Sequence, residues 1–298
     1  MEKEKFEYII KKSDAELPVK ELLKRNFGFS SRLMAKLKVH GGVERNGSPV
    51  KMYEKSLPGD RITVMLPKER SAFIPENIPI SVVYEDDDLL IINKQPGYVV
   101  HPTKGHPCHT IANGVMNYMI KQDKHFKIRF INRLDMDTSG LLVVAKNSHS
   151  QDDFSKQMSE NAVIKKYIAI VKGVMEEDEG TIDLPIDKEQ EDQLKRAVRE
   201  GGYPSVTHYK VLNRFSKGYT MVELVLETGR THQIRVHLSH LGYPVVGDVL
   251  YGQAAVWLIE RQALHAESLS FLHPVTKKRM EVTAPLPEDM LKLLEKIG

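Results

Sequence analysis

A polar segment that runs directly into an apolar one constrains this 298-residue chain more than any other stretch: INRLDMDTSGLLVVAK, from Ile131 to Lys146. The apolar run Leu141 to Ala145 predicts a buried strand, because no polar residue interrupts it. Two aspartates, an arginine and a Thr-Ser-Gly sequence stand just before it. A carboxylate at the mouth of a buried strand has the rigid support that catalysis requires. The same residue types also form ordinary tight turns, and for this segment alone the turn is the simpler interpretation.

Length and composition exclude some classes of protein. With 298 residues, 41% of them hydrophobic, the chain predicts a main domain plus a small one. No apolar run approaches the roughly 20 residues that span a bilayer, and the N-terminal MEKEKFEYII lacks the pattern of an export signal. The single cysteine, Cys108, cannot form an internal disulfide and fits a reducing compartment. We therefore expect a cytoplasmic protein with no membrane partner.

Basic residues are concentrated near the N-terminus. Residues 1–70 hold 16 Lys plus Arg against 10 Asp plus Glu, a net charge of +6, whereas the remainder holds 27 against 30, or −3. This distribution predicts a polyanion-binding unit attached to a larger body. Scattered charge in a small domain would produce the same asymmetry.

Residues 17–66 have the pattern of a compact unit. Short helices are expected at Val19–Phe27 and Ser31–Val39, where apolar residues recur on one face. Asn46-Gly47 predicts a tight hairpin, and Arg61–Leu66 predicts the strand that follows.

Strand and helix patterns mix beyond a polar linker at 68–79 that contains two prolines. Strands are expected at Ile80–Tyr84, Leu89–Asn93, Val163–Gly173, Ser205–Val211, Tyr219–Glu227, Leu264–Phe271 and Arg279–Thr283. Helices are expected at Ser150–Glu160, Ile234–Leu241 and Pro287–Ile297. The charged stretch Glu176–Arg199 is weakly patterned and predicts a surface excursion.

Two histidine-rich segments do not match metal sites. In HPTKGHPCH, His106, Cys108 and His109 stand too close together for the usual spacing of zinc ligands, and no second pair follows. In TGRTHQIRVH no acid stands where a zinc hydrolase needs one. No metal is therefore expected.

The N-terminal residues resemble the S4-type RNA-binding module. The resemblance rests on KELLKRNFGFSSRLMAKLK, GGVERNG and PGDRITVML. It implies that a helical pair presents basic residues to the phosphates of structured RNA, which positions the RNA without reading its sequence. The implied contacts are Arg25, Arg32, Lys36 and Lys38. The alternative is a solvated helix face.

Segments spread over nearly the whole chain resemble the RluA-type pseudouridine synthases, and specifically the RluD-like branch that carries an S4-type module. In the family's order they are YEDDDLLIINKQPGYVVHP, RLDMDTSGLLVVAK, KKYIAIVKG, LETGRTHQIRVHL with GYPVVGD, and ALHAESLSFLHP with APLP. The pairing of RLD with TSG is quite specific. One departure is Asn132, because the family commonly has histidine before RLD.

The resemblance implies an enzyme that isomerises uridine in RNA without metal or cofactor. Breaking the N1–C1′ bond builds positive charge on the ribose, which a carboxylate can stabilise or attack. Asp135 takes this role, either by adding to C1′ or by removing a ribose proton to give a glycal. The same uracil returns through C5, so no group-transfer cofactor is needed. Asp137 is expected to be structural and to bond the turn.

The resemblance also assigns roles around Asp135. Arg230 is expected to contact Asp135 and keep it ionised. Tyr167 is expected to stack on the uracil, and Arg133 to occupy the space that the extruded base leaves. Arg235, farther along the helix, is expected to bind substrate.

Together these observations predict an α+β protein with an RNA-binding domain at 1–67, a linker at 68–79 and a catalytic domain at 80–298. The catalytic domain is expected to be built on a mixed, mainly antiparallel β-sheet flanked by helices. The expected activity is pseudouridine formation by a monomer, in ribosomal RNA ahead of transfer RNA. Two alternatives stay open: a non-catalytic RNA-binding or ribosome-assembly factor, and a metal-dependent RNA hydrolase.

Overall fold

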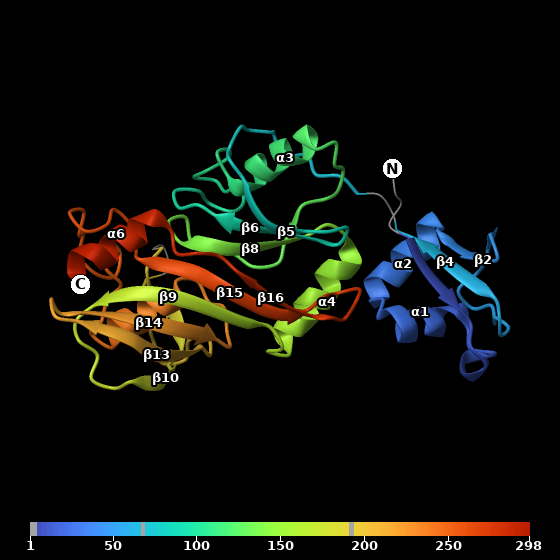
Figure 1. Ribbon diagram of the computed structural model, residues 1–298. Helices are drawn as coiled ribbons and strands as arrows, with labels where there is room; N and C mark the ends of the chain where they lie inside the picture. The colour runs from blue at the N-terminus through green and yellow to red at the C-terminus, as the bar shows by residue number, and fades with distance from the viewer. Residues whose placement is uncertain (1–4, 67–68, 191–193) are drawn as a thin grey trace.

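The computed structural model describes residues 5–66, 69–190 and 194–298, and these form a small N-terminal unit and a larger one (Figure 1). The small unit consists of β1 (Lys5–Ile9), the 3-10 turn η1 (Lys12–Asp14), α1 (Val19–Phe27), α2 (Ser31–His40), β2 (Val43–Arg45), β3 (Ser48–Pro49) and β4 (Arg61–Met65). Its strands pair in the antiparallel order β1-β4-β2-β3. The predicted helices, hairpin and final strand are confirmed, and β1 was not predicted.

Local sequence explains the shape of the small unit. Ser30 caps α2, because its hydroxyl accepts a hydrogen bond from the N–H of Leu33. Asn46 and Gly47 have φ of 51° and 84°, as the two-residue turn between β2 and β3 requires. The apolar faces of α1 and α2 then pack on β4 in a separate hydrophobic core.

The larger unit is organised around one long mixed sheet. Its strands are β5 (Ser81–Glu85), β6 (Leu89–Lys94), β7 (Arg129–Phe130), β8 (Ser139–Ala145), β9 (Ile164–Lys172), β10 (Glu179–Asp183), β13 (Val206–Phe215), β14 (Tyr219–Leu226), β15 (Leu264–Leu272) and β16 (Arg279–Thr283). Within the described ranges the main path is β10-β13-β14-β9-β15-β8-β6-β5, with β16 on β15 and β7 on β8. The β8–β15 pair is parallel and the other pairs are antiparallel. The predicted α+β fold is confirmed.

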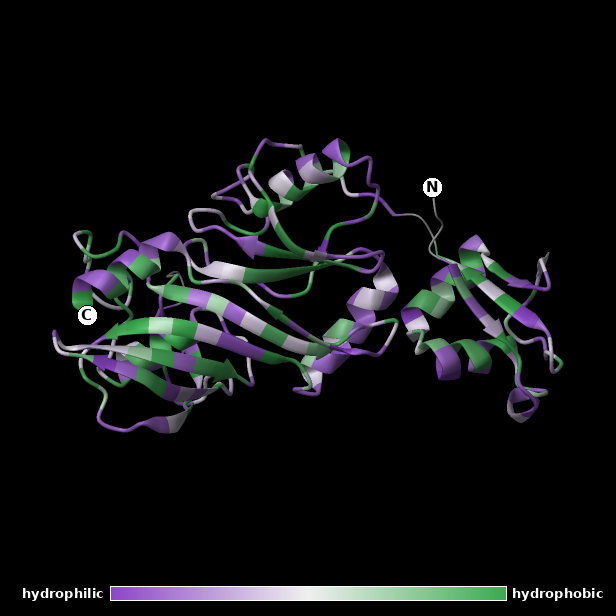
Figure 2. Ribbon diagram, in the orientation of Figure 1, coloured by the Kyte–Doolittle hydropathy of each residue, from purple (hydrophilic) through white to green (hydrophobic). Residues whose placement is uncertain are grey.

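The strand β8 lies inside this sheet, between β15 and β6. All of its residues are buried, as the apolar run predicted, and β6 beside it begins with the hydrophobic run Leu89 to Ile92 (Figure 2). Helices α3 (Ile111–Lys121), α4 (Ser148–Ser159), α5 (Gln233–His240) and α6 (Glu288–Ile297) complete the unit. β7 runs antiparallel to β8 and pairs with its last residues. The chain between the two strands therefore loops back to the start of β8.

Two features differ from the sequence-based expectations. Helix α3 was not predicted; it begins with a capping box of Thr110 and Asn113 and packs Ile111 and Val115 against β6 and β8. The expected surface excursion Glu176–Arg199 contains β10 and a separate hairpin of β11 (Ile186–Lys188) and β12 (Arg196–Val198). Its part at 191–193 lies outside the described residues. None of the described helices is long and apolar enough to cross a bilayer.

The two units touch at α4. The ring of His149 lies 5.2 Å from the rings of Phe6 and Phe29, edge-on to both. Ser30, at the start of α2, donates a hydrogen bond to Asp152. The small unit therefore docks through the start of its second helix and one side of its sheet.

Candidate active site

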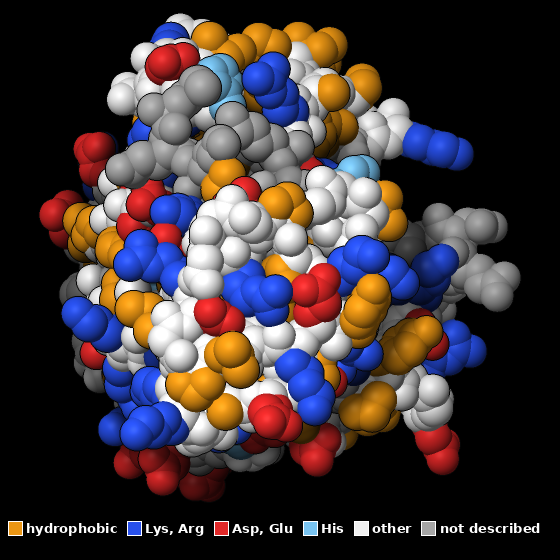
Figure 3. Space-filling model, turned by 90° about the vertical axis from the view of Figure 1, so that its right-hand side faces the viewer, with side chains coloured by type: hydrophobic (Ala, Val, Ile, Leu, Met, Phe, Trp, Pro, Cys, Tyr) orange, Lys and Arg blue, Asp and Glu red, His pale blue; other side chains and the backbone are white. Residues whose placement is uncertain are grey.

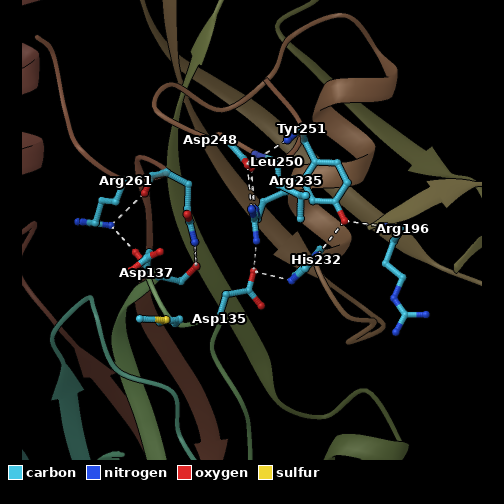
Figure 4. A network of polar contacts seen from close by, with 12 residues as sticks. Asp135, Asp137, Arg196, His232, Arg235, Asp248, Leu250, Tyr251 and Arg261 are labelled. Atoms are coloured by element: carbon cyan, nitrogen blue, oxygen red, sulfur yellow. Dashed lines mark hydrogen bonds and ion pairs between the residues drawn. The ribbon is translucent and has the colours of Figure 1, made fainter. Parts of the chain in front are cut away.

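A pocket opens where the loop before β8 meets the start of α5. Its lining residues are Arg133, Leu134, Asp135, Thr138, Tyr167, Leu226, Gly229, Arg230, His232, Gln233, Ile234, Arg235 and Leu264. The loop is a tight turn, closed by a hydrogen bond of 3.1 Å from the N–H of Thr138 to the carbonyl of Asp135. Asp135 projects from this turn toward the first turn of α5 (Figure 4).

Asp135 is bound by a buried arginine from α5. Nη1 of Arg235 donates to Oδ2 of Asp135 at 2.9 Å. The same guanidinium holds Asp248 in a two-point contact, with Nε–Oδ2 at 2.6 Å and Nη2–Oδ1 at 2.8 Å (Figure 4). Asp248 is fully buried and also accepts the N–H groups of Leu250 and Tyr251. Arg235 is thus oriented from behind by Asp248 and presents its third nitrogen to Asp135.

The two oxygens of Asp135 differ in their surroundings. Oδ2 accepts from Arg235 and faces Nε2 of His232 at 3.9 Å. Among the described residues no group donates a hydrogen bond to Oδ1. The side chain is 25% exposed at the pocket, so a carboxylate oxygen is open to a bound molecule.

Tyr167 and Arg133 complete the pocket walls. Tyr167 lies in the middle of β9 and is buried, and burial, with a smaller contribution from the charge of Asp135, raises the pKa of its phenol. Tyr167 is therefore neutral at physiological pH and presents an aromatic surface beside the carboxylate. Arg133 is exposed at the rim, two residues before Asp135.

Two buried cations hold the turn that carries Asp135. Nζ of Lys94, which is fully buried, donates to the carbonyls of Met136 at 2.7 Å and Thr138 at 2.9 Å. Nη1 of Arg261 donates at 3.0 Å to the carbonyl of Asp137, which lies between them. Three successive carbonyls are thus held, so the turn has little freedom to move.

Burial and neighbouring charges shift the pKa values of Arg235 and Lys94. Burial alone would lower the pKa of Arg235, but the hydrogen bonds and charges of Asp248 and Asp135 raise it, so this group stays charged. For Lys94 burial dominates and lowers the pKa to about 7, although Asp137 and Asp135 partly offset it.

A larger hollow lies between the two units, far from this chemistry. Its charged lining residues are Lys5, Glu7, Glu44, Arg61, Asp87, Asp88, Lys124 and Lys146. Basic and acidic groups alternate there, and no residue of the Asp135 pocket borders it. The smaller pocket, with its buried ion pairs and aromatic wall, is the better candidate for an active site.

Comparison with known proteins identifies the family. The sequence profile described as RNA pseudouridylate synthase matches residues 88–240, which include the Asp135 loop and α5. The ribosomal large subunit pseudouridine synthase D of Xanthomonas campestris pv. campestris is 43% identical over 233 residues, covering 74% of this chain and 70% of that protein. This chain belongs to the RNA pseudouridylate synthase family. The uncharacterized RNA pseudouridine synthase YlyB of Bacillus subtilis is 42% identical over 261 residues, 86% of each chain.

Solved structures agree with this family assignment. Human RNA pseudouridylate synthase domain containing 1 superposes with a TM-score of 0.58 at 30% identity, covering 70% of this chain and 83% of that one. Human RNA pseudouridylate synthase domain containing 4 has a TM-score of 0.60 at 23% identity, covering 73% and 92%, which is a likeness of fold. The predicted membership in the RluA-type synthases is confirmed, and the protein is an isomerase that converts uridine to pseudouridine in RNA.

The predicted contact between Arg230 and Asp135 is wrong. Arg230 precedes α5, and its Nε donates instead to the carbonyl of Pro204 at 3.2 Å while its guanidinium lies over the ring of Tyr203. Asp135 is bound instead by Arg235, which lies in the first turn of α5 on the side that faces the Asp135 loop. Arg230 still lines the pocket, at its exposed edge.

The expected role of the Asp137 side chain is also not found. In the described part of the chain its carboxylate takes part in no hydrogen bond, and its backbone carbonyl is what Arg261 holds. The turn is instead tied by the backbone of Asp135 and by the two buried cations. Asn132, which departs from the family pattern, bonds the backbone of β8 on both sides, donating to Leu141 and accepting from Val143.

The four basic residues expected to bind RNA divide into two pairs. Arg32 and Lys38 are exposed on α2 and make no ion pair with any residue that the structure describes. Arg25 pairs with Asp14 at 3.1 Å, and Lys36 pairs with Glu69 at 3.2 Å. Lys and Arg side chains are spread over the outer face of this end of the molecule and are interspersed with acidic ones (Figure 3).

Sequence reasoning missed several residues of the site. Lys94, Asp248 and Arg261 each act through a contact between distant segments, which spacing along the chain cannot reveal. Lys94 left the clearest signal, since it follows the apolar run LLII by only two positions and a lysine is unusual in a buried strand. His232 and Tyr251 were likewise not assigned a role.

Two groups of side chains could offer ligand atoms to a metal ion among the described residues. They are Glu76, Cys108 and His109, and Asp86, Asp88 and His273, with the ligand atoms of each group within 4.8 Å of one another. Ligand spacing along the chain does not reveal the first group, because Glu76 lies in the linker, more than 30 residues before Cys108. His109 already pairs with Glu76 and His273 with Asp86, and neither group borders the Asp135 pocket.

Proposed function

We propose that this synthase isomerises specific uridines of ribosomal RNA and that Asp135 is the carboxylate that acts on the ribose. The observation that supports Asp135 is its geometry: Oδ2 is bound by the buried Arg235, Oδ1 has no hydrogen-bond donor among the described residues, and Asp135 lines the pocket together with Tyr167. Relatives named ribosomal large subunit pseudouridine synthase D, including the one from Buchnera aphidicola at 41% identity, favour ribosomal over transfer RNA.

In the proposed reaction Asp135 meets the ribose as the N1–C1′ bond breaks. Positive charge develops at C1′, and the free carboxylate oxygen stabilises it, adds to C1′, or removes the C2′ proton to give a glycal. The uracil then turns and forms a bond from C5 to C1′; C5 loses its proton, and N1, which has lost its bond to C1′, gains one. The same base leaves and returns, so the reaction balances without a co-reactant.

The pocket residues fit the handling of an extruded nucleotide. A uridine within folded RNA leaves its stack at a cost of a few kcal/mol. We assign Tyr167 to stacking on the uracil. Arg133 and Arg230, at the rim, are assigned to the space that the extruded base leaves and to the phosphates. Arg235 orients Asp135. The exposure of both rim arginines and the burial of Tyr167 support this division.

The small unit is proposed to bring the RNA to this pocket. We propose that residues 1–67 form an S4-type RNA-binding domain, with 68–79 as linker and 80–298 as catalytic domain. The separate sheet and hydrophobic core of the small unit support this division. Arg32 and Lys38 are its best phosphate contacts, because their charges are not neutralised by a described acidic partner. We further propose that the synthase acts as a monomer in the cytoplasm.

The catalytic assignment is tested by replacing each aspartate of the turn. Asp135→Asn should abolish pseudouridine formation in single-turnover assays with a ribosomal RNA transcript, because an amide cannot stabilise or attack the developing cation. Asp137→Asn, two residues away, should retain most of the rate. An active Asp135→Asn variant would overturn the assignment, and RNA cleavage that a chelator abolishes would favour the metal-dependent hydrolase.

The RNA target requires an experiment in cells. Pseudouridines are mapped in ribosomal and transfer RNA from cells with the protein, without it, and with the Asp135→Asn variant. Sites that vanish from ribosomal RNA in both altered strains are the expected result. Loss of sites from transfer RNA alone would contradict the ribosomal assignment, and an unchanged map would favour the non-catalytic assembly factor.

A further inference from the structure

His232 lines the pocket in an unusual backbone conformation. Its φ is 59° and its ψ is 18°, in the left-handed region that few residues other than glycine adopt. It precedes α5 but makes no capping hydrogen bond through its side chain. Such conformations persist only where the surrounding structure holds them, and they cluster at functional sites. Here the imidazole points toward Asp135, and its side chain is 16% exposed (Figure 4).

Both ring nitrogens of His232 have partners. Nδ1 lies 2.8 Å from the hydroxyl of Tyr251, and Nε2 lies 3.9 Å from Oδ2 of Asp135. The Tyr251 hydroxyl already accepts the backbone N–H of Arg196, at 2.8 Å, so its own proton is available to His232. We therefore assign the proton of the neutral ring to Nε2, on the side that faces Asp135.

The surroundings keep this ring neutral. Burial lowers the pKa of His232, and the charge of Asp135 opposes that shift. The other charged groups that act on the ring are Arg235, Asp248 and Arg196. Burial raises the pKa of Tyr251 to about 12, so its hydroxyl keeps its proton at neutral pH and can donate it to His232. At neutral pH the ring thus has one acceptor, Nδ1, which takes the hydrogen bond from Tyr251. Its one donor, Nε2–H, is free to give a hydrogen bond to Asp135.

We propose that His232 is a positioning residue for the reaction, because its Nε2–H donates to Oδ2 of Asp135 in the RNA complex and leaves Oδ1 directed at the ribose. This proposal rests on the proposed role of Asp135. Arg235 binds Oδ2 through a single nitrogen, which by itself lets the carboxylate turn. A second donor on the same oxygen removes that freedom. The distance of 3.9 Å exceeds a hydrogen bond, but such contacts commonly tighten when substrate enters.

The first test compares replacements that differ in the donor. In full-length protein, His232→Phe should lower the single-turnover rate by about 100-fold, with little change in the affinity for RNA. His232→Gln, whose amide N–H lies near the place of Nε2, should recover much of the rate. Tyr251→Phe should cause a smaller loss, because it keeps the ring that lies 5.0 Å from the Arg235 guanidinium and removes only the hydroxyl. His240→Gln, at the exposed end of α5, is the matched control.

A second test reads the tautomer without any activity measurement. In nitrogen-15 spectra of histidine-labelled wild type, His232 should be protonated at Nε2 and bare at Nδ1. Tyr251→Phe should give a mixture of tautomers. A wild-type ring protonated at Nδ1 would overturn the proposal even if no variant folded.

The outcomes separate this proposal from the function on which it rests. If Asp135→Asn is inactive but His232→Phe matches the control, Asp135 keeps its role and the positioning proposal fails. Equal losses in His232→Phe and His232→Gln would also refute it, because only the second variant retains a donor. If Asp135→Asn is active, the catalytic assignment itself is wrong and the positioning role falls with it.

Discussion

Arg235 and Arg230 stand five positions apart and make different contacts, so they can be tested as a pair. Arg235→Lys should lower the single-turnover rate by about 100-fold, because an ammonium cannot hold Asp248 at two points and still reach Asp135. Arg230→Lys keeps a positive charge at the exposed rim and should change the rate little. Each rate is measured with saturating RNA; similar losses in both variants would contradict the division of roles.

The buried charge of Lys94 predicts a dependence of stability on pH. Burial lowers the pKa of Lys94 from 10.5 to about 7, so between these values the unfolded chain binds a proton that the folded chain does not. The free energy of unfolding that this group contributes therefore rises with pH across that window, by up to about 1.4 kcal/mol per pH unit. Below about pH 7 both states are protonated and the contribution is constant.

The matched variant for this prediction is Lys94→Met, which keeps the volume and removes the titration. Urea unfolding of both proteins is measured from pH 7 to 10, and the difference between them isolates Lys94 from other titrating groups. The wild type should gain stability relative to the variant as pH rises. A difference that stays flat would show that Lys94 titrates near its ordinary pKa despite its burial.

Gly140 allows the strands β8 and β15 to approach each other closely. It lies in β8 opposite Ala266 of β15, with φ of 111°, and an added Cβ would stand 2.2 Å from the carbonyl oxygen of Ala266. Gly140→Ala should therefore destabilise the sheet by about 2–3 kcal/mol. Gly105→Ala, where nothing lies within 4 Å and φ is ordinary, is the control and should change stability by less than about 0.5 kcal/mol. Thermal unfolding midpoints compare the two, and equal midpoints would contradict the steric argument.

The elements that sequence predicted best are those with an uninterrupted apolar run or with apolar residues at one regular spacing. For β8 an uninterrupted apolar run sufficed, and α1 has the predicted bounds, Val19–Phe27, because its buried residues follow a helical spacing. The contact of Arg235 with Asp135 could not be predicted in this way. It depends on which side of α5 faces a loop 100 residues earlier in the chain, and that orientation is set by tertiary packing.

The charged stretch Glu176–Arg199, which was predicted to be a surface excursion, shows a second limit of prediction from sequence patterns. Its β11–β12 hairpin has few buried apolar residues, so hydrophobic periodicity gives a weak signal there. Arg196, in β12, nevertheless reaches the site through its backbone N–H, which bonds Tyr251. A backbone contact places no demand on the side chain, and sequence patterns therefore do not record it.

On the scale of the whole molecule, the N-terminal unit should determine the salt dependence of RNA binding. Arg32 is exposed without a described acidic partner, whereas Arg25 pairs with Asp14. Arg32→Gln should reduce the slope of log affinity against log salt by about 1, because one phosphate contact is lost. Arg25→Gln should reduce it less, since Asp14 already offsets that charge. Affinities are measured over a range of salt concentrations, and equal slopes for Arg32→Gln and wild type would exclude Arg32 as a contact.

The docking of the two units should weaken in mild acid through His149. Its ring packs against both Phe6 and Phe29 across the contact. Burial lowers its pKa below the ordinary 6.5, with Asp153 opposing the shift and Lys277 reinforcing it. A separated His149 therefore takes up a proton at a higher pH than a docked one. Docking is fully stabilised above about pH 6.5 and loses stability as the pH falls through that value.

The size of the molecule in solution reports this change. Small-angle scattering of the wild type should show a larger radius of gyration at about pH 5.5 than at about pH 7.5. His149→Phe keeps an aromatic ring at the contact but cannot take up a proton, so its radius should stay constant over the same range. Since this variant leaves the acidic and basic residues around the contact in place, an equal expansion of both proteins would assign the effect to those residues instead of His149.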